Sequence, residues 1–175
     1  MPRLRSCALL ATLAAFLAFT GSAAASSPPS VFTVYKHRTS SQMVVASTGQ
    51  TTTDMSGAAM GDTQIIYGTV ARTPGGKPIG HYRGVAMLLG SAGSSSPMMR
   101  WFHAKISLPG GAIFLDDIQD SPNMAAMAAG AASPHWTYAV VGGTGRYRGV
   151  TGECDSVVTG RGTYFKDTFR LVYPR

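Results

Sequence analysis

Two carboxylates in the C-terminal part of the chain could carry out acid–base chemistry. One residue separates Glu153 from Asp155, so on a β-strand both side chains point to the same side of the sheet. If that side is an apolar interior, the pKa of each carboxyl is raised and the group can act as a general acid. Alternatively, both carboxylates are solvated or pair with Arg161 or Arg170, because charged side chains are usually exposed.

Asp116 and Asp117 form a second pair of candidate catalytic carboxylates. They are adjacent, so a strand would direct one side chain inward and the other outward. The inward carboxylate would be a second candidate general acid. The alternative is a strand end that runs into a turn at Asp120, which leaves both carboxylates in water.

Arg100 and Tyr82 are candidate ligand-binding residues. Arg100 stands at the end of an alternating and largely apolar set, which predicts that it shares the core-facing side of a strand with Phe102, Ala104, Ile106 and Leu108. An inward guanidinium could bind a carboxylate or stabilise an oxyanion. A surface arginine lying over apolar neighbours is the alternative. Tyr82 could line the same interior, although buried tyrosines more often serve the core or cap a polar group.

The chain offers no signal for a metal or a bound cofactor. His81 and His135 are isolated, and no spacing of His, Cys and Asp predicts a metal site. The segment Gly142–Gly145 follows a strand, as phosphate-binding loops do. It lacks the full Gly-x-Gly-x-x-Gly spacing, and no helix-forming run follows it. We therefore interpret it as a sharp corner between two strands.

β-Strands must position all of these residues. Apolar and alternating runs separated by turns such as Thr73–Gly76 and Pro109–Gly111 predict strands over Val31–His37, Met43–Thr48, Thr63–Ala71, Ile79–Leu89, Met98–Leu108, Ala112–Ile118, Thr137–Val141, Tyr147–Val158 and Thr163–Tyr173. Met124–Ala132 contains good helix formers but is short and lies between two prolines, so we expect a loop with one helical turn at most. The pattern indicates an all-β protein, either a closed barrel or a sandwich.

The first 25 residues have the layout of a secretory signal peptide. Arg3 and Arg5 precede an apolar run over Cys7–Thr20, and Ala23–Ala25 supplies small residues for cleavage. The run is shorter than the roughly 20 apolar residues of a membrane span. We predict a signal peptide over 1–25, a single domain over 26–175, and secretion. Removing two of the 15 Lys and Arg leaves 13 against 8 Asp and Glu, with no long basic run, so nucleic acid is not an expected partner.

Several segments give the chain a family resemblance. Val140–Arg148 reads Val-Val-Gly-Gly-Thr-Gly-Arg-Tyr-Arg and resembles the Val-Val-Gly-Gly-Thr-Gly-x-Phe-Arg segment of dirigent proteins. Ile79–Gly84 is similar to the Ile-Gly-x-x-x-Gly of the allene oxide cyclases, which share the superfamily. Tyr35–His37, Gly61-Asp62 and Tyr164–Tyr173 match in the same order. The resemblance covers nearly all of residues 26–175.

The resemblance implies an eight-stranded antiparallel β-barrel with a central ligand cavity, forming a homotrimer without a cofactor. Dirigent proteins bind phenoxy radicals that a separate oxidase makes and direct their coupling, while relatives act as cyclases. Their setting is extracellular, which is the apoplast in a plant. The expected ligand is a small phenolic or lipid-derived molecule.

The chain departs from the dirigent pattern at the positions where dirigent chemistry is carried. Tyr67-Gly68 stands where lignan-forming dirigents have an Asp pair, which makes Tyr67 a candidate ligand contact. Ala86 and Leu88 replace two tyrosines. Thr151 replaces an arginine after the glycine corner, and if it keeps the inward orientation of that arginine it is a ligand contact and Glu153 and Asp155 share its side of the strand.

Three functions remain open from the sequence. The first is a secreted dirigent-like protein that directs stereoselective coupling and has no redox activity of its own. The second is a cofactor-free cyclase or isomerase in which Glu153, Asp116 or Asp117 protonates the substrate. The third is a non-catalytic protein that binds a small molecule or the cell wall.

Overall fold

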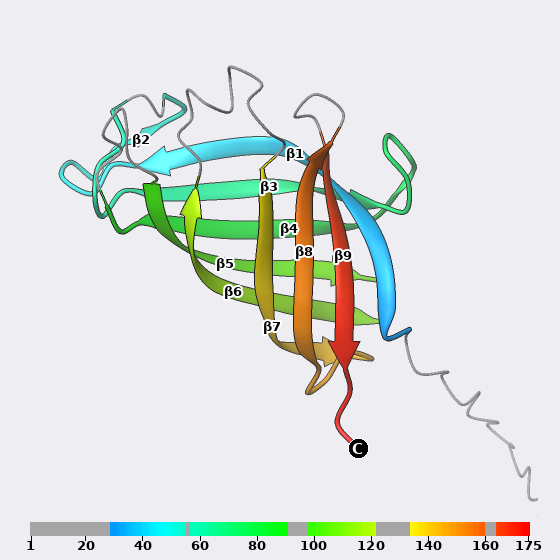
Figure 1. Ribbon diagram of the computed structural model, residues 1–175. Helices are drawn as coiled ribbons and strands as arrows, with labels where there is room; N and C mark the ends of the chain where they lie inside the picture. The colour runs from blue at the N-terminus through cyan, green and yellow to red at the C-terminus, as the bar shows by residue number, and fades with distance from the viewer. Residues whose placement is uncertain (1–28, 55–56, 91–97, 122–133, 160–163) are drawn as a thin grey trace, which may run out of the picture.

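The protein consists of nine antiparallel β-strands in the part of the chain that the computed structural model describes, residues 29–54, 57–90, 98–121, 134–159 and 164–175. The strands are β1 (Val31–Val44), β2 (Thr51–Thr52), β3 (Thr63–Ala71), β4 (Pro78–Leu88), β5 (Met98–Leu108), β6 (Gly111–Ser121), β7 (His135–Gly145), β8 (Thr151–Thr159) and β9 (Tyr164–Val172). Figure 1 shows β3–β6 lying side by side as one wall and β7–β9 crossing in front of them as another.

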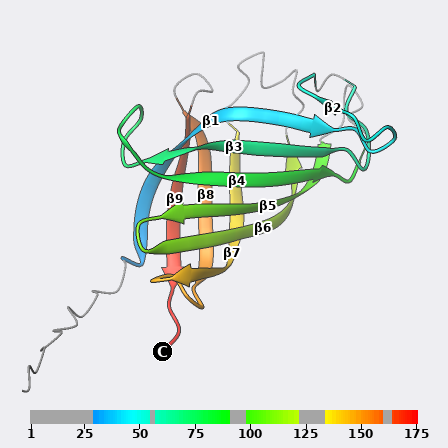
Figure 2. The ribbon, with the colours of Figure 1, turned by 180° about the vertical axis from the view of Figure 1, so that it is seen from behind.

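Eight of these strands close into a barrel. Each strand from β3 to β8 pairs with the next along the chain, and β1 pairs with both β3 and β9. The two-residue β2 pairs only with the end of β1. Seen from behind, β1 runs along the top of the green wall and then bends down beside β9 (Figure 2). The predicted eight-stranded antiparallel barrel is therefore confirmed.

Strand β1 is longer than the sequence pattern predicts. Val31–His37 and Met43–Thr48 were expected as two strands, but one strand runs from Val31 to Val44. The pairing with β3 shifts register between Arg38 and Ser40. Such a bulge bends a strand. It lets the first half of β1 pair with β9 while the second half continues along β3.

The glycine segment is a barrel corner, as predicted, and the following strand starts later than predicted. Strand β7 extends through Gly145, which has φ 60° and pairs with Gly111. The backbone N–H of Tyr147 donates to the carbonyl of Thr144 at 3.1 Å, and that of Val150 donates to Tyr147 at 3.2 Å. These turn bonds occupy the positions from which a strand over Tyr147–Val158 was expected to begin, so β8 starts at Thr151.

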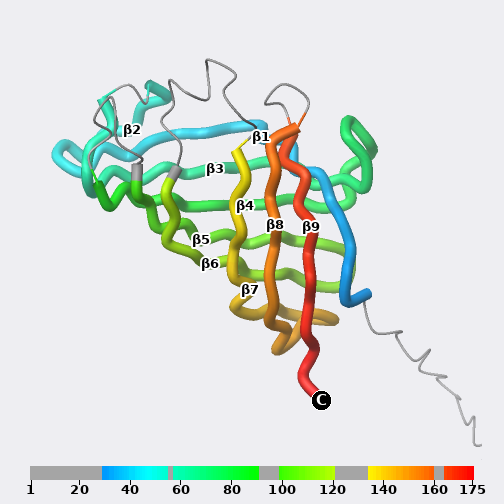
Figure 3. Tube along the Cα trace, in the orientation of Figure 1, coloured from blue at the N-terminus to red at the C-terminus, as the bar shows by residue number. Residues whose placement is uncertain are grey.

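Apolar side chains fill the end of the barrel that is drawn lowest in Figures 1 and 3. This end is formed by the start of β1, the β7–β8 corner and the end of β9. The rings of Phe32 and Phe169 stack with centroids 4.9 Å apart, and Tyr147 lies 6.4 Å from Phe32. Val150 and Leu171 are buried beside them. Close packing of this kind makes the lower end a solid core rather than a binding site.

Two predictions concern residues outside the described part of the chain: the signal peptide over Met1–Ala25 and the loop over Met124–Ala132. In the described residues, no helix is long and apolar enough to cross a membrane.

Candidate functional site

A buried ion pair lies inside the upper half of the barrel, where β8 ends and β9 begins. Lys36 of β1 and Asp167 of β9 point inward, and Lys36 Nζ lies 2.9 Å from Asp167 Oδ2. Lys36 is 4% exposed and Asp167 is 0% exposed. On β1, Lys36 shares its inward face with Val34, the residue that pairs with Asp167 across the β1–β9 strand pair. Two full charges are thus held away from water, which a protein tolerates only when they are paired and hydrogen-bonded.

Neighbours on β8 complete the surroundings of the Asp167 carboxylate. Ser156 Oγ donates to Asp167 Oδ1 at 2.8 Å. Burial raises the pKa of Asp167, while Lys36, Ser156 and the Cys154 thiol oppose the rise. Burial alone would lower the pKa of Lys36, but the Asp167 carboxylate holds it above its ordinary value. Burial also raises the pKa of the Cys154 thiol well above its usual range.

Aromatic rings surround the Lys36 ammonium. Its Nζ lies 5.4 Å from the ring centre of Tyr82, 5.8 Å from that of Tyr138 and 5.6 Å from that of Phe165. These distances allow cation–π attraction. Gly68 of β3 pairs with Tyr82 of β4, and a Cβ atom at Gly68 would collide with the Tyr82 ring. The glycine in place of the second dirigent aspartate therefore makes room for an inward tyrosine.

A second cationic group, the Arg100 cluster (Arg100, Gln119, Trp136 and Phe102), lies near the same end. Arg100 Nη2 donates to Gln119 Oε1 at 3.1 Å. The guanidinium carbon is 5.4 Å from the centre of the Trp136 ring and 5.8 Å from that of Phe102. Burial lowers the pKa of Arg100, and Tyr138 opposes this shift. Tyr138 interacts electrostatically with both groups. Burial raises the pKa of its hydroxyl, while the charges of Lys36 and Arg100 lower it.

Three of the predicted orientations are confirmed. Arg100 shares the inner face of β5 with buried Phe102 and Ala104, and Tyr82 is buried inside the barrel. Asp116 and Asp117 lie on opposite faces of β6. Asp116 accepts from Trp101 Nε1 at 2.6 Å on the outside. Asp117 pairs in the ladder with Phe102 on the inner face, and burial raises its pKa.

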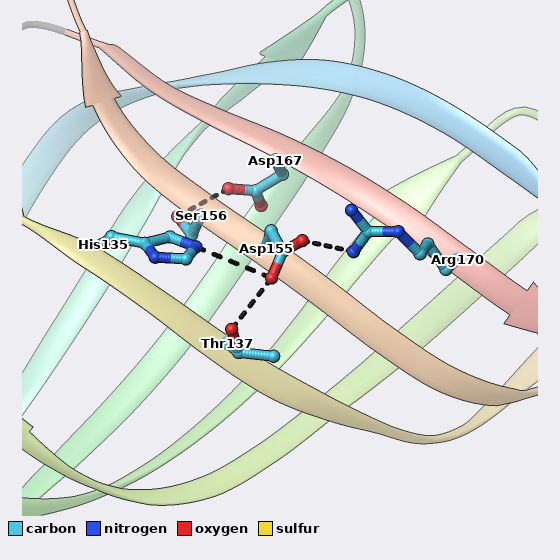
Figure 4. A network of polar contacts seen from close by, with 6 residues as sticks. All are labelled: His135, Thr137, Asp155, Ser156, Asp167 and Arg170. Atoms are coloured by element: carbon cyan, nitrogen blue, oxygen red, sulfur yellow. Dashed lines mark hydrogen bonds and ion pairs between the residues drawn. The ribbon is translucent and has the colours of Figure 1, made fainter.

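The predicted orientation of the β8 residues is wrong. Thr151 and Glu153 are exposed on the outer face. Asp155 also lies there, where Thr137 Oγ1 donates to it at 2.8 Å and Arg170 forms an ion pair with it (Figure 4). The inner face of β8 is taken by Gly152, Cys154 and Ser156, which pair with the inward residues of β7.

Tyr67 does not join the interior groups. It is 39% exposed on the outer face of β3, and its ring lies 5.6 Å from the Arg83 guanidinium. Tyr67, Thr151, Glu153 and Asp116 therefore all lie on the outer face of the barrel. Their proposed roles in ligand binding or catalysis stay predictions. Of the predicted site residues, only Arg100, Tyr82 and Asp117 face the inside of the barrel.

Sequence reasoning missed Lys36, Asp167 and Ser156. A signal was present, because Lys36 alternates with the apolar Phe32 and Val34, and Asp167 alternates with Phe165 and Phe169. A charged residue on the apolar face of each of two strands predicts a buried pair.

The interior groups can bind and polarise an organic molecule. Ammonium, guanidinium, hydroxyl and indole N–H groups are donors, and four aromatic rings offer flat apolar surface. Such donors fixed in a water-poor interior stabilise developing negative charge. No three His, Cys, Asp or Glu side chains gather at a possible metal site within the described residues.

Comparison with known proteins supports the fold. No protein-family model matches the chain, and the search of curated proteins finds no match. Among solved structures, a pyocyanin demethylase has a TM-score of 0.60 at 19% identity, with 81% of this chain and 99% of that chain covered. A pterocarpan synthase dirigent protein has a TM-score of 0.58 at 15% identity, covering 83% and 95%.

A Diels–Alderase from Streptomyces koyangensis has a TM-score of 0.58 at 17% identity, and the match covers 82% of this chain and 64% of that one. These structures are similar to this protein in fold, although few residues are identical. The predicted resemblance is therefore confirmed at the level of architecture. The chain shares the antiparallel barrel fold of these solved structures.

Proposed function

We propose that the protein binds a small phenolic or lipid-derived molecule in the upper half of the barrel. It directs the stereoselective coupling or cyclisation of a reactive intermediate and has no redox activity of its own. The observation that carries this proposal is the buried Lys36–Asp167 pair set among the rings of Tyr82, Tyr138 and Phe165. Buried charges cost free energy, and their place beside aromatic surface suits a polar aromatic ligand.

The barrel would act by restricting geometry. A reactive intermediate held in one conformer has one reactive face accessible, so an unselective reaction becomes directed. Exclusion of water would also suppress competing addition of solvent. The dirigent and Diels–Alderase barrels among the structural neighbours support this role, since both are described as acting on small molecules.

A coupling assay tests the directing role. Laccase oxidises a simple 4-hydroxyphenylpropene with and without the protein, and chiral chromatography measures the dimers. We expect the protein to change the enantiomeric excess and to leave the rate of oxidation unchanged. A racemic product across a range of phenols and lipid-derived radicals would contradict the proposal. Bovine serum albumin at equal concentration is the control for non-specific adsorption.

A cofactor-free cyclase is the second candidate, and one observation favours it. Asp117 faces inward, and burial raises the pKa of its carboxyl, which suits a general acid. A cyclase would convert a quinone methide or epoxide with no oxidant present. In that case Asp117→Asn abolishes turnover, while Asp116→Asn on the outer face of the same strand does not.

A non-catalytic binding protein would do neither of these things. It would only show a melting temperature that rises with the right ligand. The coupling assay, the oxidant-free assay and the melting curve therefore separate the three functions.

Location and assembly are part of the proposal. The predicted signal peptide over 1–25 supports secretion, and an extracellular site would bring the protein together with a separate oxidase. The family resemblance supports a homotrimer. Expression of the full chain with detection in the medium tests secretion, and light scattering of the purified protein tests the trimer.

A further inference from the structure

Two buried N–H donors in the Arg100 cluster have no hydrogen-bond partner among the described residues. They are Nε of Arg100 and Nε1 of Trp136. Buried donors are nearly always paired, because an unpaired one has lost its water and gained nothing in return. Two such donors in contact indicate a place where a further group is expected.

The surroundings of Arg100 fix the direction in which its guanidinium points. Its Nη2 is held by Gln119 Oε1 at 3.1 Å, and its carbon lies between the rings of Phe102 and Trp136. The centre of the Trp136 ring is 5.4 Å from the guanidinium carbon, so the two free donors belong to neighbouring side chains. Gln119 Nε2 also lacks a hydrogen bond of normal geometry, although it favours the ionised form of neighbouring Asp117.

Arg100 has no ion-pair partner at this end of the barrel among the described residues. Asp167 is engaged by Lys36 and Ser156, so it is not available to Arg100. No ion pair joins Arg100 to a carboxylate in the described part of the chain, and Arg38 adds a further positive charge that disfavours the charged form of Arg100. An anionic oxygen would meet both the free donors and the Arg100 charge that no ion pair neutralises.

We propose that Arg100, Trp136 and Gln119 form an oxyanion-binding subsite for an aromatic ligand bearing a carboxylate or phenolate oxygen. The ligand oxygen accepts from Arg100 Nε and Trp136 Nε1, and its ring packs beside Phe102. This rests on the proposed function, because the ligand must enter the barrel. It adds that the ligand is anionic and that its charged group lies at Arg100.

Matched pairs of probes test the subsite. Cinnamate and cinnamyl alcohol share a skeleton and differ in the carboxylate. Above neutral pH, 4-nitrophenolate and 4-nitroanisole differ in the phenolate charge. Isothermal titration of the full barrel should give cinnamate, 4-nitrophenolate or both at least tenfold tighter binding than the neutral partner. The pair that shows the larger ratio identifies the ligand as a carboxylate or a phenolate.

Two variants remove the donors separately. Arg100→Met removes the charge and should abolish the preference for the anion while keeping the affinity for the neutral probe. Trp136→Phe keeps the ring and removes one donor, so the preference should fall several-fold. The controls are Lys105→Met and Trp101→Phe, which change a basic residue and a tryptophan on the outer face of β5 and should keep the preference.

The outcomes separate this subsite from the proposed function. If the wild type binds the anion and the neutral probe equally, or if Arg100→Met keeps the preference, the subsite is wrong and ligand binding in the barrel stands. If none of the four probes binds, the subsite is wrong as well, and the coupling assay decides the proposed function independently. Should Arg100→Met fail to fold, Trp136→Phe replaces it as the test, because it retains charge and shape, and an unchanged preference would overturn the subsite.

Discussion

Two cations lie inside the same end of the barrel, the buried Lys36 and the partly buried Arg100, and their partners differ. Lys36 has a carboxylate at 2.9 Å, and that carboxylate is fixed by Ser156. Arg100 has one amide oxygen, the Tyr138 hydroxyl and two aromatic rings, and its Nε is left without a partner among the described residues. Lys36 thus has a counter-charge among the described residues, and Arg100 does not.

The difference indicates which cation the fold depends on and which one still has a hydrogen-bond donor available to a ligand. Removing one partner of a buried pair leaves an uncompensated charge, so such a pair must be kept for the barrel to stay folded. A buried donor without a partner weakens the free protein and becomes useful only when something binds. Stability should therefore depend on Lys36 and Asp167 far more than on Arg100.

Asp167→Asn should have the largest effect on stability. It leaves the Lys36 ammonium buried without a counter-charge, which costs about 3–5 kcal/mol of unfolding free energy. Urea unfolding followed by tryptophan fluorescence measures the loss. The double variant Lys36→Met/Asp167→Leu removes both charges and should recover most of it. A loss below about 1 kcal/mol in the single variant would mean that water reaches the pair.

Ser156→Ala should have the second largest effect. Its hydroxyl donates to a buried carboxylate, and a hydrogen bond to a charged group contributes about 1.5–3 kcal/mol. Thr137→Val removes a bond of the same 2.8 Å length from Asp155 on the outside of the barrel. That control should cost much less, because water replaces the lost donor. Equal losses of unfolding free energy in the two variants would show that a hydrogen bond inside the barrel contributes no more than one on its surface.

Arg100→Met should change the unfolding free energy by about 1 kcal/mol or less. One hydrogen bond to Gln119 is lost, while the cost of an unpaired buried donor is relieved. The same urea titration measures it beside Asp167→Asn. A loss as large as that of Asp167→Asn would show that Arg100 is structural, like Lys36, and would remove the distinction between the two cations.

Asp155→Asn should have the smallest effect, and its effect should depend on pH. The hydrogen bonds from Arg170 and Thr137 hold the pKa of Asp155 below its ordinary value. The carboxylate therefore stabilises the fold above the unfolded pKa of about 3.9, and this contribution is lost as pH falls through the lower pKa of the folded state. Melting curves of variant and wild type should differ slightly at neutral pH and converge in acid. High salt should also reduce the difference, since the pair is partly exposed.

The sequence predicts the barrel well because strands and turns are local signals. Alternation along Met98–Leu108 places Arg100 on the inner face, and the adjacent Asp116 and Asp117 fall on opposite faces as expected. Orientation fails at β8, where Thr151 was assigned the inward face of an arginine in other proteins. Cys154 is a small apolar residue and is fully buried, so Glu153 and Asp155 beside it must face outward. The local signal was the better guide there.

The buried pair could not be predicted with the same security, because it depends on pairing across the barrel. Lys36 and Asp167 are 131 positions apart in the chain, and only the closure of β1 on β9 brings them together. Alternation marks each as a charged residue on an apolar face. It does not say which opposite charge each will meet.

The pairing of β1 with β9 also removes the open sheet edges through which the chain could aggregate. Val31 of β1 pairs with Arg170 of β9, so the first strand to leave the ribosome must wait for the last one. Until then the growing sheet has two open edges, each with unpaired N–H and C=O groups that a neighbouring chain could extend. Contacts this distant in sequence form slowly. A nascent chain of this protein is therefore most dependent on chaperones in the interval between the synthesis of β8 and the docking of β9.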